Sequence, residues 1–255
     1  LFIAMTGRTP NTGVYLEKNR QPVCEIQVTL PTSFDDAIWP MVGWLAGHKS
    51  PNGIPLISGL EDISINNDGL KALCAAFGTT SAAPMIHIKG HTPEDELQNI
   101  KCANSTSIMP IDLLNLWQNF NIGNNKIDLV AIGSPHASTS ECLKFLEFLM
   151  DKNEVVNVPT ILTVGRDTLV KLEEFGHLNQ LTKLGVQVVP DICWCSITEP
   201  IFPSKTQTLV TNSGKYAHYG KGLTGRNVRF GSLENCASAS INGYVDDDFP
   251  QWLTA

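Results

Sequence analysis

Two patterns of hydrophobic and polar positions alternate along the second half of the chain. Short apolar runs bounded by turn residues predict buried parallel strands, here at Ile127–Gly133, Pro159–Val164 and Gly185–Asp191. Between them, apolar residues recur every three or four positions, which predicts helices over Ser138–Asp151 and Asp167–Phe175. Strands and helices in this order favour an α/β fold with a doubly wound, mostly parallel sheet.

The first third of the chain shows the same elements less clearly. We expect strands at Val23–Leu30 and Ala83–Ile88. The segment Asp68–Gly78 has apolar residues at helical spacing, and its glycine ends the predicted helix. A polar stretch, Thr92–Ser107, is predicted to be a loop. This part of the chain therefore contains elements of a second α/β unit.

The last segment, Thr208–Ala255, is mixed. It is expected to enter as a strand, continue as a loop, and finish with a helix capped by Ser232 and ended by Gly243. We therefore predict three parts: residues 1–110 belong to a first α/β domain, 120–207 form a doubly wound domain, and 208–255 return to the active site.

Composition and charge narrow the classes of function. The 255 residues are 42% hydrophobic and only 17% charged, so the chain has a sizeable core to bury and is not disordered. No apolar run approaches the roughly 20 residues of a membrane span, and the apolar start is too short for a signal peptide. We expect a fragment of a cytoplasmic protein.

A net charge of −7 without a basic stripe disfavours nucleic acid and anionic membranes as partners. One basic cluster suits a small anionic substrate: Lys215, Lys221, Arg226 and Arg229.

Two polar segments are candidates for a site. In GSPHAS, Gly133–Ser138, a predicted strand ends and a helix begins, and His136 lies where helix N–H groups attract anions. A loop histidine that only caps the turn is the alternative. The segment TNSGKYAHYG, Thr211–Gly220, is dense in hydroxyl, amino, phenol and imidazole groups that transfer protons or bind anions. The alternative interpretation of this segment is a surface loop without a role in a site.

The seven cysteines include no CxxC pair and do not indicate a disulfide scaffold. Cys193 follows the third predicted strand, at the edge where ligands bind to such sheets. Cys236 falls in the first turn of the last predicted helix, where the helix dipole lowers the pKa of a thiol. Spacing alone leaves both buried thiols and metal ligands open.

Several segments occur in a characteristic order: TGRTPNTGVYLEKNR, IPLISGL, DGLKALCAAFGTT, HIKGHTPE, IGSPHAS, TNSGKYAHYG and FGSLENCASA. Together they resemble the catalytic, large-subunit region of aconitase X, a branch of the aconitase superfamily. The resemblance extends from Thr6 to about Gly243. It implies aconitase-like α/β/α domains, and a chain that corresponds to the C-terminal portion of the catalytic region.

The resemblance implies a hydro-lyase. The favoured reaction is dehydration of cis-3-hydroxy-L-proline to Δ1-pyrroline-2-carboxylate. The alternatives are the large subunit of a mevalonate 5-phosphate dehydratase and a non-catalytic relative that senses iron or binds a partner. The implied cofactor is an iron–sulfur cluster acting as a Lewis acid, with a 2Fe–2S cluster favoured. The implied partner is the small swivelling domain or subunit of the same enzyme.

Site residues follow from the matched segments. Cys193 and Cys236 match two cluster-ligand positions, whereas Cys195 is expected to be a bystander. The segments that match the active site supply the expected catalytic residues, His136, Ser213 and Lys215, and the expected substrate-binding residues, Thr6, Gly7, Arg8, Ser134 and Asn212. Dehydration removes a proton beside a carboxylate and expels hydroxide, so cations such as Arg8 and Lys215 suit the developing charge.

Overall fold

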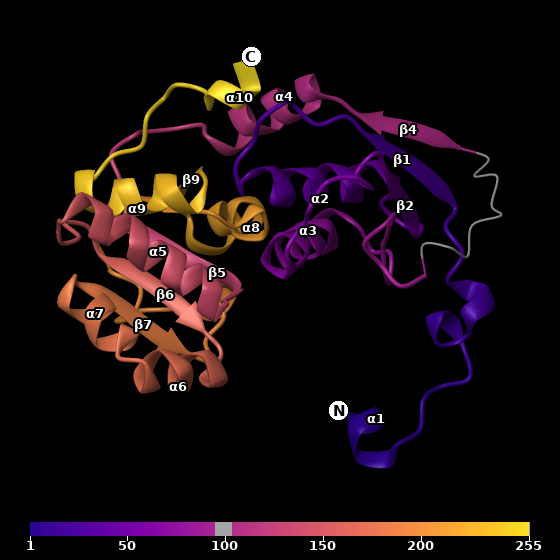
Figure 1. Cartoon of the computed structure of the whole chain (residues 1–255), viewed down its shortest axis with the longest axis horizontal. Coiled ribbons are helices and arrows are strands. Elements are labelled where there is room, and N and C mark those ends of the chain that lie inside the picture. The colour runs from indigo at the N-terminus through magenta and orange to yellow at the C-terminus, as the bar shows by residue number, and fades with distance from the viewer. Residues whose placement is uncertain (95–103, 255) are drawn as a thin grey trace.

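The computed structural model describes residues 1–94 and 104–254, which form two α/β units, each built on a parallel sheet (Figure 1). The first sheet has the order β3-β2-β1-β4, with strands β1 (Cys24–Val28), β2 (Pro55–Ser58), β3 (His87–Ile88) and β4 (Ser105–Ile108). The second has the order β7-β6-β5-β8-β9, with strands β5 (Leu129–Ala137), β6 (Thr160–Val164), β7 (Val186–Pro190), β8 (Thr208–Thr211) and β9 (Asn227–Phe230). The predicted α/β fold class is confirmed.

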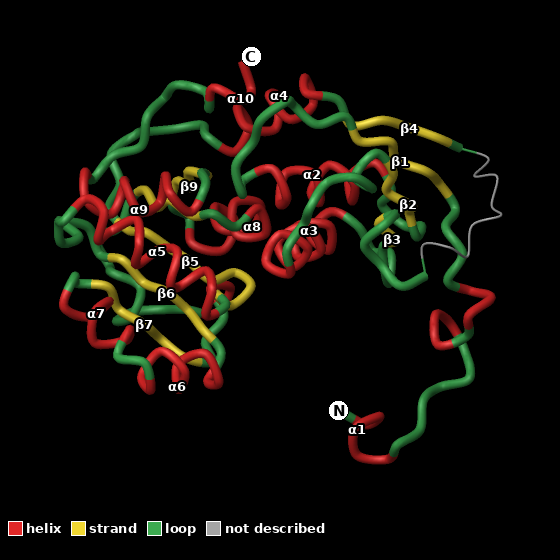
Figure 2. Tube along the Cα trace, viewed as in Figure 1, coloured by secondary structure: helices red, strands yellow, loops and turns green. Residues whose placement is uncertain are grey.

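The described helices connect and cover these strands (Figure 2). Those of the first unit are α2 (Ile38–Lys49), α3 (Asn67–Thr80) and α4 (Pro110–Phe120). Those of the second are α5 (Thr139–Lys152), α6 (Arg166–Glu174), α7 (His177–Lys183), α8 (Gly214–Thr224) and α9 (Leu233–Asn242). Short elements complete the chain: α1 (Phe2–Thr6), η1 (Gly13–Tyr15), η2 (Glu17–Asn19), η3 (Trp194–Ser196) and α10 (Gln251–Thr254).

The second sheet is doubly wound. The chain moves outward from β5 through β6 to β7, then returns to the other side of β5 for β8 and β9. Alternate residues of β5 point to opposite faces, so Val130 joins the core under α5 and α9 while Leu129 joins the core under α8 and η3. The topology changes direction between β5 and β8, and ligands bind at the carboxyl ends of strands at such a point.

The first unit packs α2 tightly against α3. A Cβ atom added to Gly43 would lie 2.0 Å from the carbonyl oxygen of Leu73, so only glycine allows this contact. Nearly every side of α2 is buried. Its apolar residues therefore show no amphipathic period, which is why the sequence pattern did not predict this helix.

Three local predictions need correction. β5 does not end at Gly133 but continues to Ala137, with a shift in its pairing with β6, so His136 lies in a strand rather than a loop. The segment after Ser213 is the helix α8, not a loop, because Ser213 caps it by accepting a hydrogen bond from the Tyr216 amide. The end of the loop predicted at 92–107 is part of β4, while its residues 95–103 lie outside the described residues.

The two units touch through α2, α3 and α8, which Figure 1 shows side by side. Gly214 at the start of α8 meets α2, where an added Cβ would lie 2.8 Å from the Pro40 Cβ atom. In the same interface the Trp44 indole donates a hydrogen bond to the Nδ1 atom of His218 over 3.1 Å. The division at residues 110, 120 and 207 stays a prediction, although β8 and β9 extend the sheet that contains β5.

The segment that contains α1, η1 and η2 extends away from both sheets (Figure 1) and has no buried residue in these three elements. Among the described residues, the helices are too short or too polar to cross a bilayer.

Candidate active site

A pocket of about 430 Å³ lies between the two units, and we call it the central pocket. It collects residues that follow the carboxyl ends of β1 and β8, next to the points where each sheet changes direction. The lining residues are Phe34, Asp35, Asp36, Trp39, Ser64, Asn66, Asp68, Gly69, Ala72, Ser140, Glu141, Lys144, Asn212 and Leu233.

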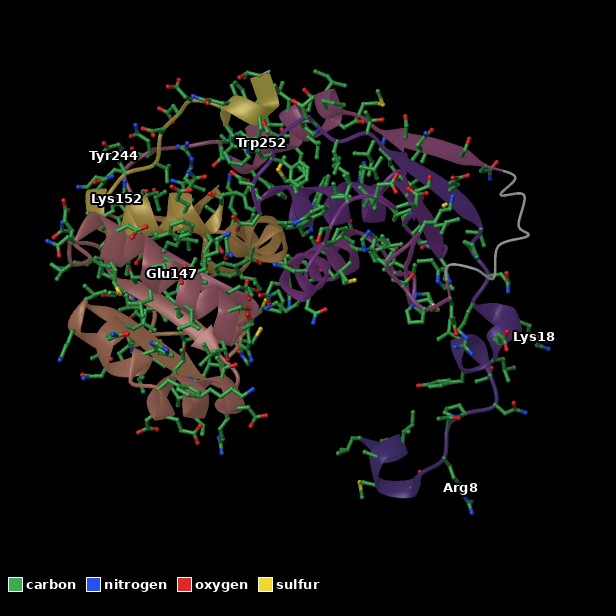
Figure 3. All side chains as sticks on the ribbon, viewed as in Figure 1. Arg8, Lys18, Glu147, Lys152, Tyr244 and Trp252 are labelled. Carbon is green, nitrogen blue, oxygen red and sulfur yellow. The ribbon has the colours of Figure 1, made fainter. Side chains whose placement is uncertain are left out.

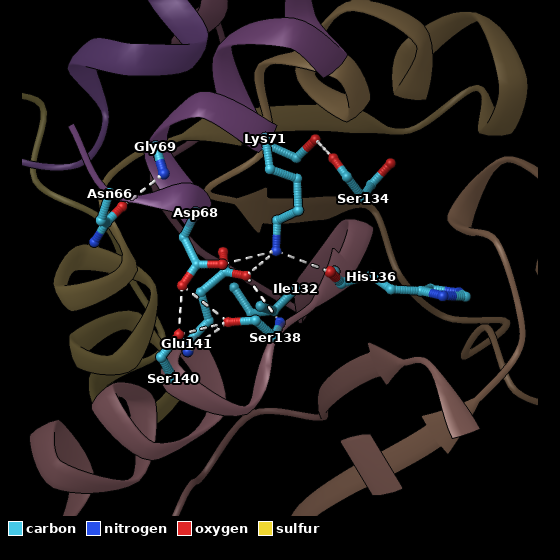
Figure 4. Close-up of polar contacts among 12 residues, drawn as sticks. Asn66, Asp68, Gly69, Lys71, Ile132, Ser134, His136, Ser138, Ser140 and Glu141 are labelled. Atoms are coloured by element: carbon cyan, nitrogen blue, oxygen red, sulfur yellow. Dashed lines mark hydrogen bonds and ion pairs between the residues drawn. The ribbon is translucent and has the colours of Figure 1, made fainter. Parts of the chain in front are cut away.

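Lys71 lies at the centre of a polar network that joins the two units (Figure 4). Its ammonium group pairs with Glu141 of α5, donates to the Asp68 carboxylate over 3.2 Å and donates to the His136 carbonyl over 3.1 Å. Asp68 also accepts from the Ser138 hydroxyl over 2.9 Å, and Glu141 accepts from the Ser138 amide over 2.9 Å. One cation therefore fixes the start of α5 against α3.

The two carboxyl groups of the network, Glu141 and Asp68, have pKa values shifted in opposite directions. Burial raises the pKa of Glu141, and the nearby Lys71 charge does not fully offset this. Burial also acts on Asp68, but hydrogen bonds from Ser140 and Ser138 together with the Lys71 charge lower its pKa. Burial works against the Lys71 cation, yet the Glu141 and Asp68 charges raise its pKa. Two carboxyl groups with opposite shifts are a typical arrangement for acid and base roles.

A narrow inner chamber opens behind this network. It is lined by Pro40, Lys71, Ala72, Ser134, Pro135, Glu141, Asn212, Ser213 and Gly214, so three of its residues also line the central pocket. The Ser213 hydroxyl donates to the Ser134 carbonyl and accepts from the Tyr216 amide, which locks β5 to α8. The Ser134 hydroxyl is buried at 3% exposure and has no hydrogen-bond partner among the described residues.

A third hollow, the side pocket of about 550 Å³, lies on the other side of Lys71 and includes His136. The His136 Nε2 atom lies 3.0 Å from the Ile192 carbonyl, so it carries the proton and donates. Arg166 at the start of α6 pairs with Asp191 over 2.7 Å along the same pocket. The predicted residues Ser134, His136, Asn212 and Ser213 are thus brought together around Lys71.

Cys193 and Cys236, the two predicted cluster ligands, lie in different surroundings. Cys236 is fully buried in the core under α5 and α9, and burial raises its pKa well above the ordinary value, whereas the helix position alone predicted a lowered one. Cys193 is exposed, contacts Cys195, and precedes Trp194 in the core on the opposite face of the sheet.

These donors do not form a cluster site by themselves. Among the described residues, no group of three His, Cys, Asp or Glu side chains is placed to hold a metal ion. The ligand roles of Cys193 and Cys236 therefore stay predictions. Lys215 is half-buried near Cys195 and outside the linings of the three pockets described above, so its catalytic role also stays a prediction.

Thr6, Gly7 and Arg8 lie apart from this cluster. All three are exposed, and Figure 3 shows Arg8 pointing away from both units. A Cβ atom added to Gly7 would meet no atom within 4 Å. The substrate-binding role that the resemblance implies for this segment stays a prediction.

Sequence reasoning missed Lys71, Asp68 and Glu141 as site residues. Asp68 and Lys71 lie inside a good helical pattern, and Glu141 fits the start of a helix, so each had an adequate local explanation. The signal that they form a site is their meeting across about 70 positions of sequence, which spacing does not reveal.

Comparison with known proteins agrees with this architecture. The family description "Aconitase X second domain" matches residues 21–118, and "Aconitase X third domain" matches residues 127–242. The chain is similar to a crystal structure of Thermococcus kodakaraensis aconitase X in its holo-form, with a TM-score of 0.82 and 26% identity. That match covers 93% of this chain and 60% of the other.

Named relatives are dehydratases. The chain is 35% identical to a cis-3-hydroxy-L-proline dehydratase of Hypocrea jecorina and 37% identical to one of Pseudomonas aeruginosa, over 100% and 98% of its length. It is 28% identical to the phosphomevalonate dehydratase large subunit of Thermococcus kodakarensis over 92% of its length. It spans 44% of the first two relatives and 59% of the third. The chain belongs to the aconitase X family and contains the second and third domains of that family.

Proposed function

We propose that the protein is a dehydratase that converts cis-3-hydroxy-L-proline to Δ1-pyrroline-2-carboxylate. The observation that carries the proposal is the position of the Lys71 network, between two pockets and an inner chamber at the carboxyl ends of β5 and β8. Support also comes from the two relatives of that name, which share 35% and 37% identity with the chain.

The reaction transfers the proton beside the substrate carboxylate to a base, and the neighbouring hydroxyl leaves as water with a proton from an acid. The electrons of the broken C–H bond form a ring C=C bond, which tautomerises to the C=N bond of the product. The carboxylate gains negative charge as the proton leaves, and a fixed cation such as Lys71 stabilises that charge. Burial raises the pKa of Glu141, so this carboxyl group takes up a proton more readily than an exposed glutamate; once protonated, it no longer neutralises Lys71 and can donate to the departing hydroxyl. We assign substrate binding to Ser134 and Asn212, which line the inner chamber.

His136, Ser213 and Lys215 keep their proposed catalytic roles, and Thr6, Gly7 and Arg8 their proposed substrate contacts. Ser213 acts by holding Ser134 in place. The iron–sulfur cofactor, a small swivelling domain or subunit, and a cytoplasmic location are also part of the proposal. Because the described thiols do not assemble a cluster site, we derive no step through that cofactor.

Dehydration of mevalonate 5-phosphate is the second candidate, supported by relatives such as the Thermococcus large subunit. The central pocket disfavours it, since carboxylates outnumber ammonium groups in the pocket lining and would repel a phosphate.

The test uses the intact protein, purified without oxygen. Turnover of cis-3-hydroxy-L-proline and of mevalonate 5-phosphate is measured side by side, with iron and sulfide quantified in the same sample. Turnover of the hydroxyproline with little of the phosphate is the expected result. Faster turnover of the phosphate would overturn the proposed substrate, and iron without turnover of either would favour a sensing role.

A further inference from the structure

We propose that Asp35 and Asp36, with the neighbouring rings of Phe34 and Trp39, bind the positively charged ring nitrogen of an amino-acid substrate. This wall of the central pocket would then set the preference for a cyclic amino acid over an uncharged or phosphorylated hydroxy acid. The inference rests on the proposed function and names the residues that decide its substrate.

Neither aspartate pairs with a cation in the described part of the chain, although Lys144 also lines the pocket, and burial raises the pKa of Asp35 in the absence of such a partner. Asp35 accepts a hydrogen bond from the Ala37 amide over 3.0 Å and also interacts with the Trp252 side chain, while Asp36 accepts a hydrogen bond from the Leu233 amide over 3.0 Å. No ion pair among the described residues involves either group. By contrast, Asp68 and Glu141 share the Lys71 cation. A cationic ligand group would therefore find its partner at the two aspartates.

The aromatic neighbours identify an organic cation. The rings of Phe34 and Trp39 meet edge to face, with centroids 5.5 Å apart, and both line the pocket. Aromatic faces attract ammonium groups and cover the methylene groups that flank a ring nitrogen. A divalent metal ion needs several oxygen ligands at short range, and the described residues hold no group of three such side chains.

An independent observation points to a ligand at the inner end of the same space. The Ser134 hydroxyl is buried and unpartnered, and it lines the inner chamber, which shares Ala72, Glu141 and Asn212 with the central pocket. A buried hydroxyl without a partner is unfavourable and rare, so a ligand polar group is its natural complement. The inner chamber has a volume of only about 20 Å³, room for one small polar group such as a carboxylate oxygen. In a cyclic α-amino acid the carboxylate sits beside the ring nitrogen, so one ligand in the central pocket presents both groups.

The experiment compares two ligands that differ in one atom. L-Proline and (S)-tetrahydrofuran-2-carboxylate have the same ring size and carboxylate, but only proline carries a ring ammonium. Dissociation constants for both are measured by calorimetry on the intact protein and on Asp35→Asn and Asp36→Asn variants. We expect the intact protein to prefer proline by roughly tenfold or more, and each variant to lose most of that preference.

Asp151→Asn is the matched control, because Asp151 is exposed at the end of α5. It should leave the preference unchanged. Asp36 also holds the start of α9, so Asp35→Asn keeps the test valid if the Asp36 variant does not fold. Equal weakening of both ligands, or an unchanged preference in Asp35→Asn, would overturn the inference. Saturable binding of Mg²⁺ that both variants abolish, with the ligand preference intact, would also overturn it.

The outcome is distinguishable from failure of the proposed function. Turnover of cis-3-hydroxy-L-proline by a protein that binds both ligands equally would remove the inference alone. A protein that prefers proline through Asp35 but does not dehydrate the hydroxyproline would retain the amino-acid site and lose the proposed reaction.

Discussion

Lys71 of α3 and Glu141 of α5 form an ion pair that joins the two α/β units. The lysine side chain is 30% exposed and the glutamate side chain 17%, so the pair is partly shielded from water. Asp68 is the second carboxylate on the same ammonium group. The cation therefore separates two carboxyl groups that would otherwise repel each other.

Replacing Lys71 by methionine should lower the free energy of unfolding by roughly 1–3 kcal/mol, since it leaves two carboxylates facing each other. It should also reduce turnover by at least about tenfold if Lys71 stabilises the developing charge. Urea denaturation and steady-state kinetics measure the two effects. Lys152→Met, an exposed change at the end of α5, should alter neither. Unchanged kinetics in Lys71→Met would remove Lys71 from the reaction.

Acid should weaken the fold through His218. Burial lowers the pKa of His218 below its ordinary value of 6.5, and its neutral Nδ1 atom accepts from Trp44. As the pH falls, His218 is therefore protonated at a higher pH in the unfolded chain than in the folded protein. This contribution to stability is complete above pH 6.5 and is lost as the pH falls through the folded-state pKa.

Unfolding free energies measured from pH 7.5 to 5 should show this loss, and His218→Gln should abolish that part of the pH dependence. His177→Gln, at a half-buried histidine in α7 that does not contact Trp44, is the control and should keep the acid sensitivity. Identical pH curves for the intact protein and His218→Gln would contradict the assignment.

Cys236→Ser places a hydroxyl in the core under α9 and should lower the free energy of unfolding by about 1–3 kcal/mol. Cys142→Ser is the matched control, because Cys142 is buried in the same core and burial raises its pKa to about 12. Both variants should lose similar stability in thermal unfolding. The ligand role that the family resemblance implies requires more: Cys236→Ser alone should lose bound iron. Equal iron in the two variants would leave Cys236 as a core thiol.

Gly214→Ala should force α8 away from α2, because the new Cβ would lie 2.8 Å from the Pro40 Cβ. Overpacking of this kind costs about 1–3 kcal/mol. On the same helix, Gly222→Ala meets no atom within 4 Å and should instead stabilise the fold by roughly 0.5–1 kcal/mol, since alanine favours helices. Thermal unfolding of both variants provides the comparison, and equal shifts would contradict the close contact.

Local chemistry explains which elements could be predicted. The helix capped by Ser232 and ended by Gly243 was predicted from its two end residues, and α9 has both caps. Periodicity also located β6, β7 and α3, each with one clear pattern. It missed α2, whose residues are buried on nearly all sides, and it ended β5 too early, because polar residues in Gly133–Ala137 look like a loop.

The candidate site was only half predictable. Ser134 and His136 lie in the last residues of β5, and Asn212 and Ser213 follow β8, so all four are at strand ends where ligands bind, and the structure brings them together. The Lys71 network depends on contacts between distant segments, which no local pattern contains. Arg229 is the opposite case: it was predicted to belong to a basic cluster that binds a substrate, but its side chain is 2% exposed and pairs with Asp247.

The Ser213 hydroxyl bonds to β5 and to α8 at once, so it makes the stability of the helix cap depend on the register of the strand. A slip of β5 by one residue would turn every one of its side chains to the wrong face and would move the Ser134 carbonyl out of reach. The same hydroxyl would then lose its acceptor while still serving as the cap of α8. A strand in the wrong register therefore loses stability in two places: its apolar side chains leave the core, and the Ser213 hydroxyl loses a hydrogen bond.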